Sequence, residues 1–247
     1  MKFIRLFTLI TLFISCSNNV EEKKSISFSE KNYDEAFQLI EYWLNAQKDY
    51  ENLPGLTAMV GNEDGVIWSE AFGMASDTNM MSIENTFSIC SISKLFTSIA
   101  IMKLVEEQKI NLNDPIDKLL PWFDLKQQFK NSPPLTIKSI LTHSSGLPRE
   151  SNHPYWSWPD FPFPTKDEVV KDLKNQEMLY PSSKYYQYSN LGLSLLGYVI
   201  EEVSGESFDD YVTKNILDPL TMDNTKTYMS NEEYGGVLSV GYSSIKR

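Results

Sequence analysis

FSICSISK, at residues 87–94, is the most informative stretch of this 247-residue sequence. It places Ser91 three residues before Lys94, and an apolar run follows as far as about Gln108. Three residues are close to one helical turn, so in a helix the two side chains share a face and the lysine amine can take the proton of the serine hydroxyl. A serine at a helix start also faces the positive end of the helix dipole, which favours an oxyanion formed beside it. The stretch indicates a nucleophilic serine, and the apolar run predicts a helix buried in the centre of the domain.

The Ser-x-x-Lys spacing is not specific by itself. Composition alone predicts about two such pairs in this chain, and the sequence holds a second one, Ser243 with Lys246, which has no helix after it. Tyr-x-Asn likewise occurs twice, at residues 50–52 and at residues 188–190. The assignment therefore depends on the sequence around these pairs.

Periodicity and turn residues predict the elements around the serine. An amphipathic helix is expected at residues 33–49, followed by a hairpin whose strands at 56–60 and 66–69 meet at Asp64 and Gly65. Residues 148–165 hold many prolines and aromatic residues and predict an ordered loop, either one lip of a substrate cleft or a lid over the core. Further helices are expected at residues 136–141, 191–203 and 208–217.

Four blocks occur in order along the chain: residues 87–94, LNDP at 112–115, LTIKSILTHSSGLP at 135–148 and YSNLG at 188–192. Together they resemble the serine β-lactamase and penicillin-binding-protein superfamily, in its class C-like branch of hydrolases and esterases. The resemblance extends over about residues 52–242. It implies an α/β (α+β) fold of the β-lactamase/transpeptidase type, in which a mainly helical subdomain centred on the Ser91 helix packs on an antiparallel sheet whose C-terminal strands are missing here.

The resemblance also implies roles for four residues. Ser91 would be the acylated nucleophile and Lys94 its proton acceptor. Tyr188 would shuttle the proton to the leaving group and activate water for deacylation, and Asn190 would hydrogen-bond the substrate and the lysine side. Structural roles stay open: a helix N-cap for Ser91 or for Asn190, and a buried tyrosine with a satisfied hydroxyl for Tyr188.

The function expected from the resemblance is that of a serine hydrolase that forms an acyl-enzyme on Ser91. Its substrates would be β-lactams, D-alanyl peptides or esters, and it would need no metal or organic cofactor. The alternative is a catalytically silent binding or sensor lipoprotein of the same fold. His143 invites a triad interpretation, but no GxSxG stretch accompanies it and no acid partner is readable, so we expect a structural, hydrogen-bonded histidine.

One family motif is absent from the sequence. After Asn190, no lysine or histidine precedes a Ser-Gly or Thr-Gly pair, since Ser204 and Gly205 follow Val203. In the resembled family that motif lies on a strand lining the cleft and supplies a cation, and the same strand donates the second N–H of the oxyanion hole. We therefore expect the domain, residues 33–247, to be incomplete at its C-terminus, the product of a fragment or truncated gene, and catalytically impaired as it stands.

The composition of the chain excludes several other functional classes of protein. The chain carries 22 Lys and Arg against 33 Asp and Glu, a net charge of −11 that would repel nucleic-acid phosphates. Two cysteines and two histidines cannot build a disulfide framework or a zinc site of the cysteine-rich or three-histidine type. The HExxH and P-loop patterns are absent as well. The partner expected is a small-molecule or peptide substrate.

The N-terminus has the pattern of a lipoprotein export signal. Basic residues at positions 2 and 5 precede an uncharged apolar run, which predicts a signal peptide over residues 1–15. The junction before Cys16 resembles a bacterial lipobox, so Cys16 would carry a lipid anchor, and the polar residues 16–32 would form a tether. The signal peptide and the lipid anchor imply a membrane-anchored protein of the bacterial cell envelope. Cys90 would then stay a free, buried thiol.

Overall fold

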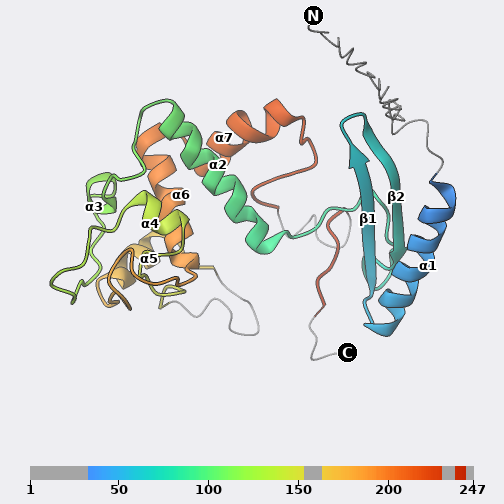
Figure 1. The fold of residues 1–247 in the computed structure, drawn as a ribbon, viewed down its shortest axis with the longest axis horizontal. Helices are drawn as coiled ribbons and strands as arrows, with labels where there is room; N and C mark the ends of the chain where they lie inside the picture. Colours follow the sequence, from blue (N-terminus) through green and yellow to red (C-terminus); the bar gives the residue numbers. More distant parts are fainter. Residues whose placement is uncertain (1–32, 153–162, 230–236, 243–247) are drawn as a thin grey trace, which may run out of the picture.

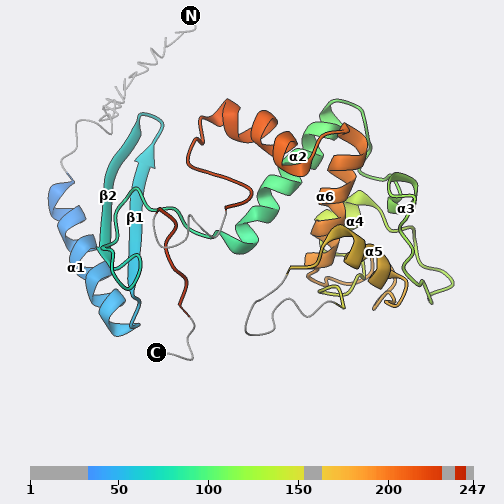
Figure 2. The same cartoon turned by 180° about the vertical axis from the view of Figure 1, so that it is seen from behind.

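The computed structural model describes residues 33–152, 163–229 and 237–242. In this part of the chain, one helix and a two-stranded antiparallel sheet form one end of the molecule, and a group of helices forms the other (Figure 1). Helix α2 (Ser93–Glu106) extends from the helical group toward the sheet (Figures 1 and 2). The predicted signal peptide, Cys16 and the tether lie outside the described residues, as does most of the aromatic loop.

The predicted N-terminal helix and hairpin are confirmed. α1 (Asp34–Tyr50) packs against β2 (Gly65–Gly73), which pairs with β1 (Gly55–Asn62) in antiparallel register. The Phe37 ring stacks on Trp68 at a centroid distance of 5.6 Å, and the Trp68 indole donates to a Glu41 carboxylate oxygen at 3.0 Å. The apolar face of α1 thus covers one face of the hairpin, which an isolated two-stranded sheet needs for stability.

The helical group packs around α6 (Asn190–Ser204), whose inward side is completely buried. α2 and α4 (Ile137–Leu141) contact it, as does α7 (Phe208–Val212). These four helices were predicted, although the last one is shorter than expected because the chain continues as a π-helix over Thr213–Leu217 and a 3-10 turn over Asp218–Leu220.

Two short helices, α3 (Ile116–Leu119) and α5 (Lys166–Leu173), were not predicted. The fully buried core residues include Ile101, Leu104, Ile137, Ile140, Leu195 and Leu196.

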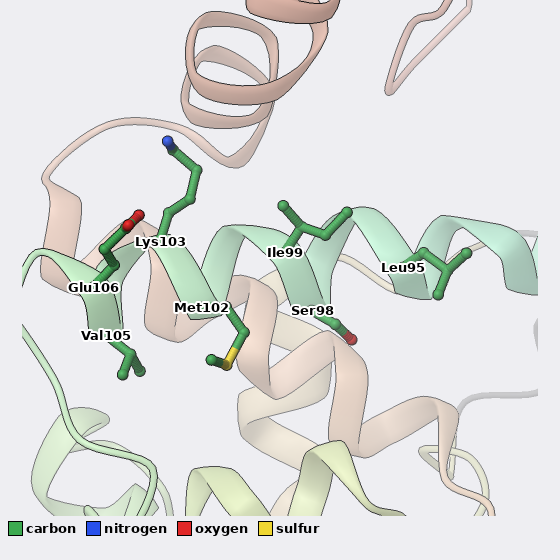
Figure 3. A pocket seen from close by; sticks show the side chains of 7 residues that line it. All are labelled: Leu95, Ser98, Ile99, Met102, Lys103, Val105 and Glu106. Atoms are coloured by element: carbon green, nitrogen blue, oxygen red, sulfur yellow. The ribbon is translucent and has the colours of Figure 1, made fainter. Parts of the chain in front are cut away.

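The prediction that the helix after Ser91 is buried in the centre of the domain is correct for only one side of the helix. One side of α2 is fully buried through Ala100, Ile101 and Leu104, whereas Leu95 is 61% exposed and Ile99 and Met102 are each 46% exposed. The exposed side chains border an open hollow of about 490 Å³, lined by residues of α2 between Leu95 and Glu106 (Figure 3). A helix that is apolar on all sides is expected to be buried, but its sequence does not show which other elements cover it.

Hydrogen bonds join the LNDP block to the block at residues 135–148. The Ile116 N–H, just after LNDP, donates to the Leu135 carbonyl at 2.9 Å. Thr136 caps α4 by accepting from the Ser139 N–H at 3.2 Å, and Ser139 bonds back to the Thr136 N–H in a capping box. The LNDP block is therefore held at the start of α4.

The segment Val237–Tyr242 returns to the sheet end of the molecule. The Thr86 N–H donates to the Val237 carbonyl at 2.9 Å, and the Ser239 N–H donates back to the Thr86 carbonyl at 2.9 Å. This bridge precedes the stretch at residues 87–94 and anchors its start. Among the helices of the described residues, none has the length and apolar character needed to cross a membrane.

Candidate active site

Ser91, Lys94 and Tyr188 lie together in the structure. The Tyr188 hydroxyl donates to Ser91 Oγ at 2.8 Å, and Lys94 Nζ donates to the same oxygen at 3.2 Å. Lys94 Nζ also lies 5.0 Å from the centroid of the Tyr188 ring. The serine oxygen is therefore held between an amine from the first turn of α2 and a phenol from a segment far along the chain.

Ser91 is placed by a tight turn before α2. It sits in a 3-10 turn (Cys90–Ile92), and Ile92, not Ser91, is the N-cap residue of α2. The N-cap alternative for Ser91 is thus excluded, because its hydroxyl contacts Lys94 and Tyr188 instead of a backbone N–H. Cys90 has a positive φ of 47°, a strained conformation for a residue with a side chain. Its thiol is exposed, which corrects the expectation that it is buried.

Tyr188 is held from one side by His143. The two rings lie 4.4 Å apart, and His143 Nδ1 accepts a hydrogen bond from the Ser189 N–H at 3.2 Å. The Gln187 N–H donates to the His143 carbonyl at 2.6 Å. Burial lowers the pKa of His143, and the positive charge of Lys94 lowers it further. A neutral imidazole can accept the hydrogen bond from the Ser189 N–H, so His143 is a structural, hydrogen-bonded histidine that packs against the tyrosine, as predicted.

A glycine turn brings the end of the third block beside Tyr188. Gly146 has a φ of 79°, and a Cβ added there would lie 2.1 Å from the Tyr180 carbonyl oxygen. Two residues on, the Pro148 carbonyl accepts from Ser189 Oγ at 2.6 Å. The same Ser189 oxygen accepts from the Gly192 N–H at 2.9 Å and caps α6. The turn and the cap therefore hold the residues on both sides of Ser189 in place.

Asn190 is the first residue of α6. The N-cap of this helix is Ser189, so the alternative role of Asn190 as the N-cap is wrong. Asn190 Nδ2 donates to Glu150 Oε1 at 2.6 Å, and its backbone N–H donates to the Arg149 carbonyl at 2.7 Å. Within the part of the chain that the structure describes, Asn190 makes no hydrogen bond to Ser91 or Lys94, and its buried Oδ1 has no partner. The structure thus brings three of the four predicted residues into direct contact and attaches the fourth to Glu150.

The charges around Tyr188 favour its ionised form. Its pKa is lowered from the ordinary value of tyrosine, first because Lys94 hydrogen-bonds its oxygen and then because Ser91 does, while burial acts in the opposite direction. The positive charges of Lys94 and Arg149 lower it further. Arg149 Cζ lies 5.1 Å from the centroid of the Tyr188 ring. A phenolate at this position can accept the proton of the Ser91 hydroxyl.

Sequence reasoning missed two polar residues of the site, Arg149 and Glu150. They follow the SSGLP end of the third block directly, and this position next to the block is the signal that the sequence contains. Periodicity cannot find such residues, because a loop has no repeat that predicts where its side chains lie. In the described part of the chain, no group of three or more His, Cys, Asp or Glu side chains is arranged to hold a metal ion.

Comparisons with known proteins agree with this geometry. A protein-family model described as Beta-lactamase matches residues 43–237. Beta-lactamase-like protein 2 of Dictyostelium discoideum is 27% identical over 231 residues, which cover 92% of this chain and 42% of that protein. The chain therefore spans less than half the length of this relative.

Two solved structures extend the likeness to the fold. An octameric penicillin-binding protein homologue from Pyrococcus abyssi superposes with a TM-score of 0.71 at 29% identity, over 84% of this chain and 48% of its own. A beta-lactamase/D-alanine carboxypeptidase from Yersinia pestis superposes with a TM-score of 0.68 at 25% identity, over 85% of this chain and 60% of its own. These likenesses confirm the expected mixed α/β fold of the β-lactamase/transpeptidase type.

Proposed function

The chain belongs to the beta-lactamase family, and on that premise we propose that it is a serine hydrolase that forms an acyl-enzyme on Ser91. The contact that supports this proposal most directly is the double hydrogen bond to Ser91 Oγ, from Tyr188 at 2.8 Å and from Lys94 at 3.2 Å. A nucleophile within hydrogen-bond reach of its base, with the base oriented by a further group, is the arrangement that nucleophilic catalysis requires. His143 orients the tyrosine here.

Acylation follows from the positions of these atoms. Tyr188, as a phenolate, takes the Ser91 hydroxyl proton while Oγ forms a bond to the carbonyl carbon of the substrate. Lys94, which the resemblance made the proton acceptor of Ser91, acts in this proposal by hydrogen-bonding both oxygens and stabilising the phenolate before the transfer. When the tetrahedral intermediate collapses, the bond from carbon to the leaving group breaks and Tyr188 returns the proton to that group.

Deacylation reverses the roles at the same atoms. A water molecule in place of the leaving group gives a proton to Tyr188, and its oxygen attacks the ester carbonyl of the acyl-enzyme. The bond between the acyl carbon and Ser91 Oγ then breaks, and the proton passes to Ser91. Only Ser91 and Tyr188 exchange protons with the substrate and water in this scheme, and the proposal therefore invokes no metal or organic cofactor.

The substrate class proposed is a β-lactam, a D-alanyl peptide or an ester, since each presents a carbonyl carbon to a serine nucleophile. The name of the Yersinia pestis relative includes both beta-lactamase and D-alanine carboxypeptidase, and the proposed export signal and lipid anchor at Cys16 would place this chain in the cell envelope. A lipid anchor there would bring Ser91 close to cell-wall substrates.

A catalytically silent binding or sensor lipoprotein is the second candidate. The observation in its favour is the position of the Asn190 amide, which was expected beside Lys94 but donates to Glu150 Oε1 at 2.6 Å. The two candidates differ in one chemical event, the covalent modification of Ser91.

Covalent labelling distinguishes the two candidates. The purified protein is incubated with a fluorescent penicillin and, separately, with a fluorescent fluorophosphonate, and labelling is followed over time on a denaturing gel. The hydrolase proposal predicts a fluorescent band that is lost in Ser91→Ala and kept in Ser93→Ala, the matched control two residues along. If neither probe labels the native protein, the silent binding protein is the better account.

A further inference from the structure

Arg149 and Glu150 form a pair beside both polar residues of the YSN block. Arg149 Cζ lies 5.1 Å from the centre of the Tyr188 ring. Arg149 Nε donates to Glu150 Oε1 at 3.2 Å, and the same carboxylate oxygen accepts from Asn190 Nδ2 at 2.6 Å. One carboxylate oxygen thus holds both the guanidinium over Tyr188 and the amide of Asn190.

The backbone of this pair is fixed as well. The Arg149 carbonyl accepts from the N–H groups of Asn190 and Leu191, at 2.7 Å and 3.2 Å, in the first turn of α6. The Glu150 carbonyl accepts from the Gln176 side-chain amide at 3.0 Å. Because the backbone and the side chain of Arg149 are both hydrogen-bonded, the loop fixes the position of the guanidinium over the ring. The Arg149 side chain is nevertheless 62% exposed.

We propose that Arg149 is a positioning residue of the Ser91 reaction: its guanidinium, held by Glu150, supplies a second cation to Tyr188 and stabilises the phenolate that accepts the serine proton. This inference rests on the proposed hydrolase function. Arg149 follows the SSGLP turn directly.

The charges around Tyr188 support this role. Lys94 approaches the ring from α2 at 5.0 Å, and Arg149 approaches it from the loop after Gly146 at 5.1 Å. The third group at the ring is His143, whose pKa is lowered, so it adds no positive charge at neutral pH. Glu150 is the negative group of the cluster, and its carboxylate bonds to the guanidinium and to Asn190. The ring therefore faces two cations, of which Arg149 is the one that the reaction scheme does not otherwise use.

A direct titration of Tyr188 tests the proposal without requiring turnover. The full chain is labelled with tyrosine carrying ¹³C at Cζ, Tyr188 is assigned as the resonance lost in Tyr188→Phe, and its chemical shift is followed from neutral to alkaline pH. In Arg149→Gln we expect the midpoint to rise, with about threefold less phenolate at a fixed pH below the midpoint, as expected for loss of a cation near an exposed ring. Arg149→Lys, which keeps the charge, should lie closer to the native protein.

Lys214→Gln is the matched control, because it also removes one cation from an exposed ion pair, here with Glu206. It should leave the Tyr188 midpoint at its native value. The proposal is overturned if the midpoint of Arg149→Gln equals that of the native protein, or if Lys214→Gln shifts it by as much. Labelling by the fluorophosphonate is measured on the same samples: a shifted midpoint without labelling contradicts the hydrolase proposal alone, and labelling with an unshifted midpoint contradicts the role of Arg149 alone.

Discussion

The Tyr188 hydroxyl lies 2.8 Å from Ser91 Oγ although 97 positions separate the two residues in the chain. The contact depends on two turns, the 3-10 turn that presents Ser91 before α2 and the Gly146 turn that leads to the cap of α6. A packed pair of helices, α2 and α6, keeps the two segments together. The site is therefore a property of the folded helical group and not of either sequence block alone.

Removal of the tyrosine hydroxyl should slow acylation strongly. In Tyr188→Phe, Ser91 loses the group that takes its proton, and positioned proton transfer contributes on the order of 100-fold or more to such a step. We expect the fluorophosphonate to label this variant about 100-fold more slowly than the native protein, with an unchanged circular dichroism spectrum. Tyr185→Phe, in an exposed residue that packs on Tyr180, is the control and should label at the native rate. Equal rates for Tyr188→Phe and the native protein would contradict the base role of Tyr188.

The labelling rate should depend on pH with a defined sign. The reaction needs the phenolate of Tyr188, so the rate should rise as the pH rises through the pKa of this residue. Because Lys94 and Ser91 hydrogen-bond the phenol, that pKa is lowered and the rise should occur below the pH at which an ordinary tyrosine ionises. Lys94→Gln removes the largest of these contributions and should move the rise to higher pH. A rate that is flat, or that falls with pH across this range, would show that another group limits acylation.

Stability should depend on the turn at Gly146. Gly146→Ala forces a side chain into a φ of 79° and brings its Cβ to 2.1 Å from the Tyr180 carbonyl oxygen. Backbone strain of this kind costs about 1–3 kcal/mol, and the clash adds to it, so the free energy of unfolding in a urea titration should fall by at least that amount.

Gly205→Ala is the matched control for that clash. Gly205 has a φ of 73° at the C-cap of α6, and a Cβ added there meets no atom within 4 Å. It should carry only the cost of the left-handed conformation, about 1–2 kcal/mol. If Gly205→Ala destabilises the protein as much as Gly146→Ala, close packing at the Gly146 turn is not what requires the glycine.

The proposed anchor at Cys16 has a separate test. In a bacterial host that processes lipoproteins, the native chain should take up radiolabelled palmitate and sediment with the membrane fraction. Cys16→Ser should lose both properties, whereas Cys90→Ser should keep both, since Cys90 is part of the folded domain. Palmitate incorporation by Cys16→Ser at the native level would contradict the proposed lipid anchor.

The sequence predicted the elements whose signals are local. The hairpin turn at Asp64 and Gly65, the end of α6 at Gly205 and the short helix after Thr136 are all where their turn and cap residues placed them. The burial of α2 was predicted correctly for only one side, since an apolar sequence does not reveal that Leu95 and Ile99 face outward while Ile101 faces the core. The short helix α5 was missed although Thr165 and Glu168 form a capping box, a signal that the sequence does contain.

The candidate site was likewise predicted only in part. The blocks around Ser91 and Tyr188 predicted which residues would come together, because the family resemblance orders them along the chain. Asn190 was expected beside Lys94, but its amide bonds to Glu150. That contact depends on a loop whose path follows from tertiary packing around Gly146 and the cap of α6, and neither periodicity nor residue type encodes it.

The acylation of Ser91 can be measured directly as an increase in the mass of the protein. The purified protein is mixed with an activated ester or a penicillin, quenched in acid within the time course of the reaction and analysed by intact-protein mass spectrometry, with peptide mapping of the adduct. The account predicts one added acyl group on the peptide that contains Ser91, which decays as water releases it, and no adduct in Ser91→Ala. An adduct on another residue, or an equal adduct in Ser91→Ala, would contradict the assignment of Ser91 as the nucleophile.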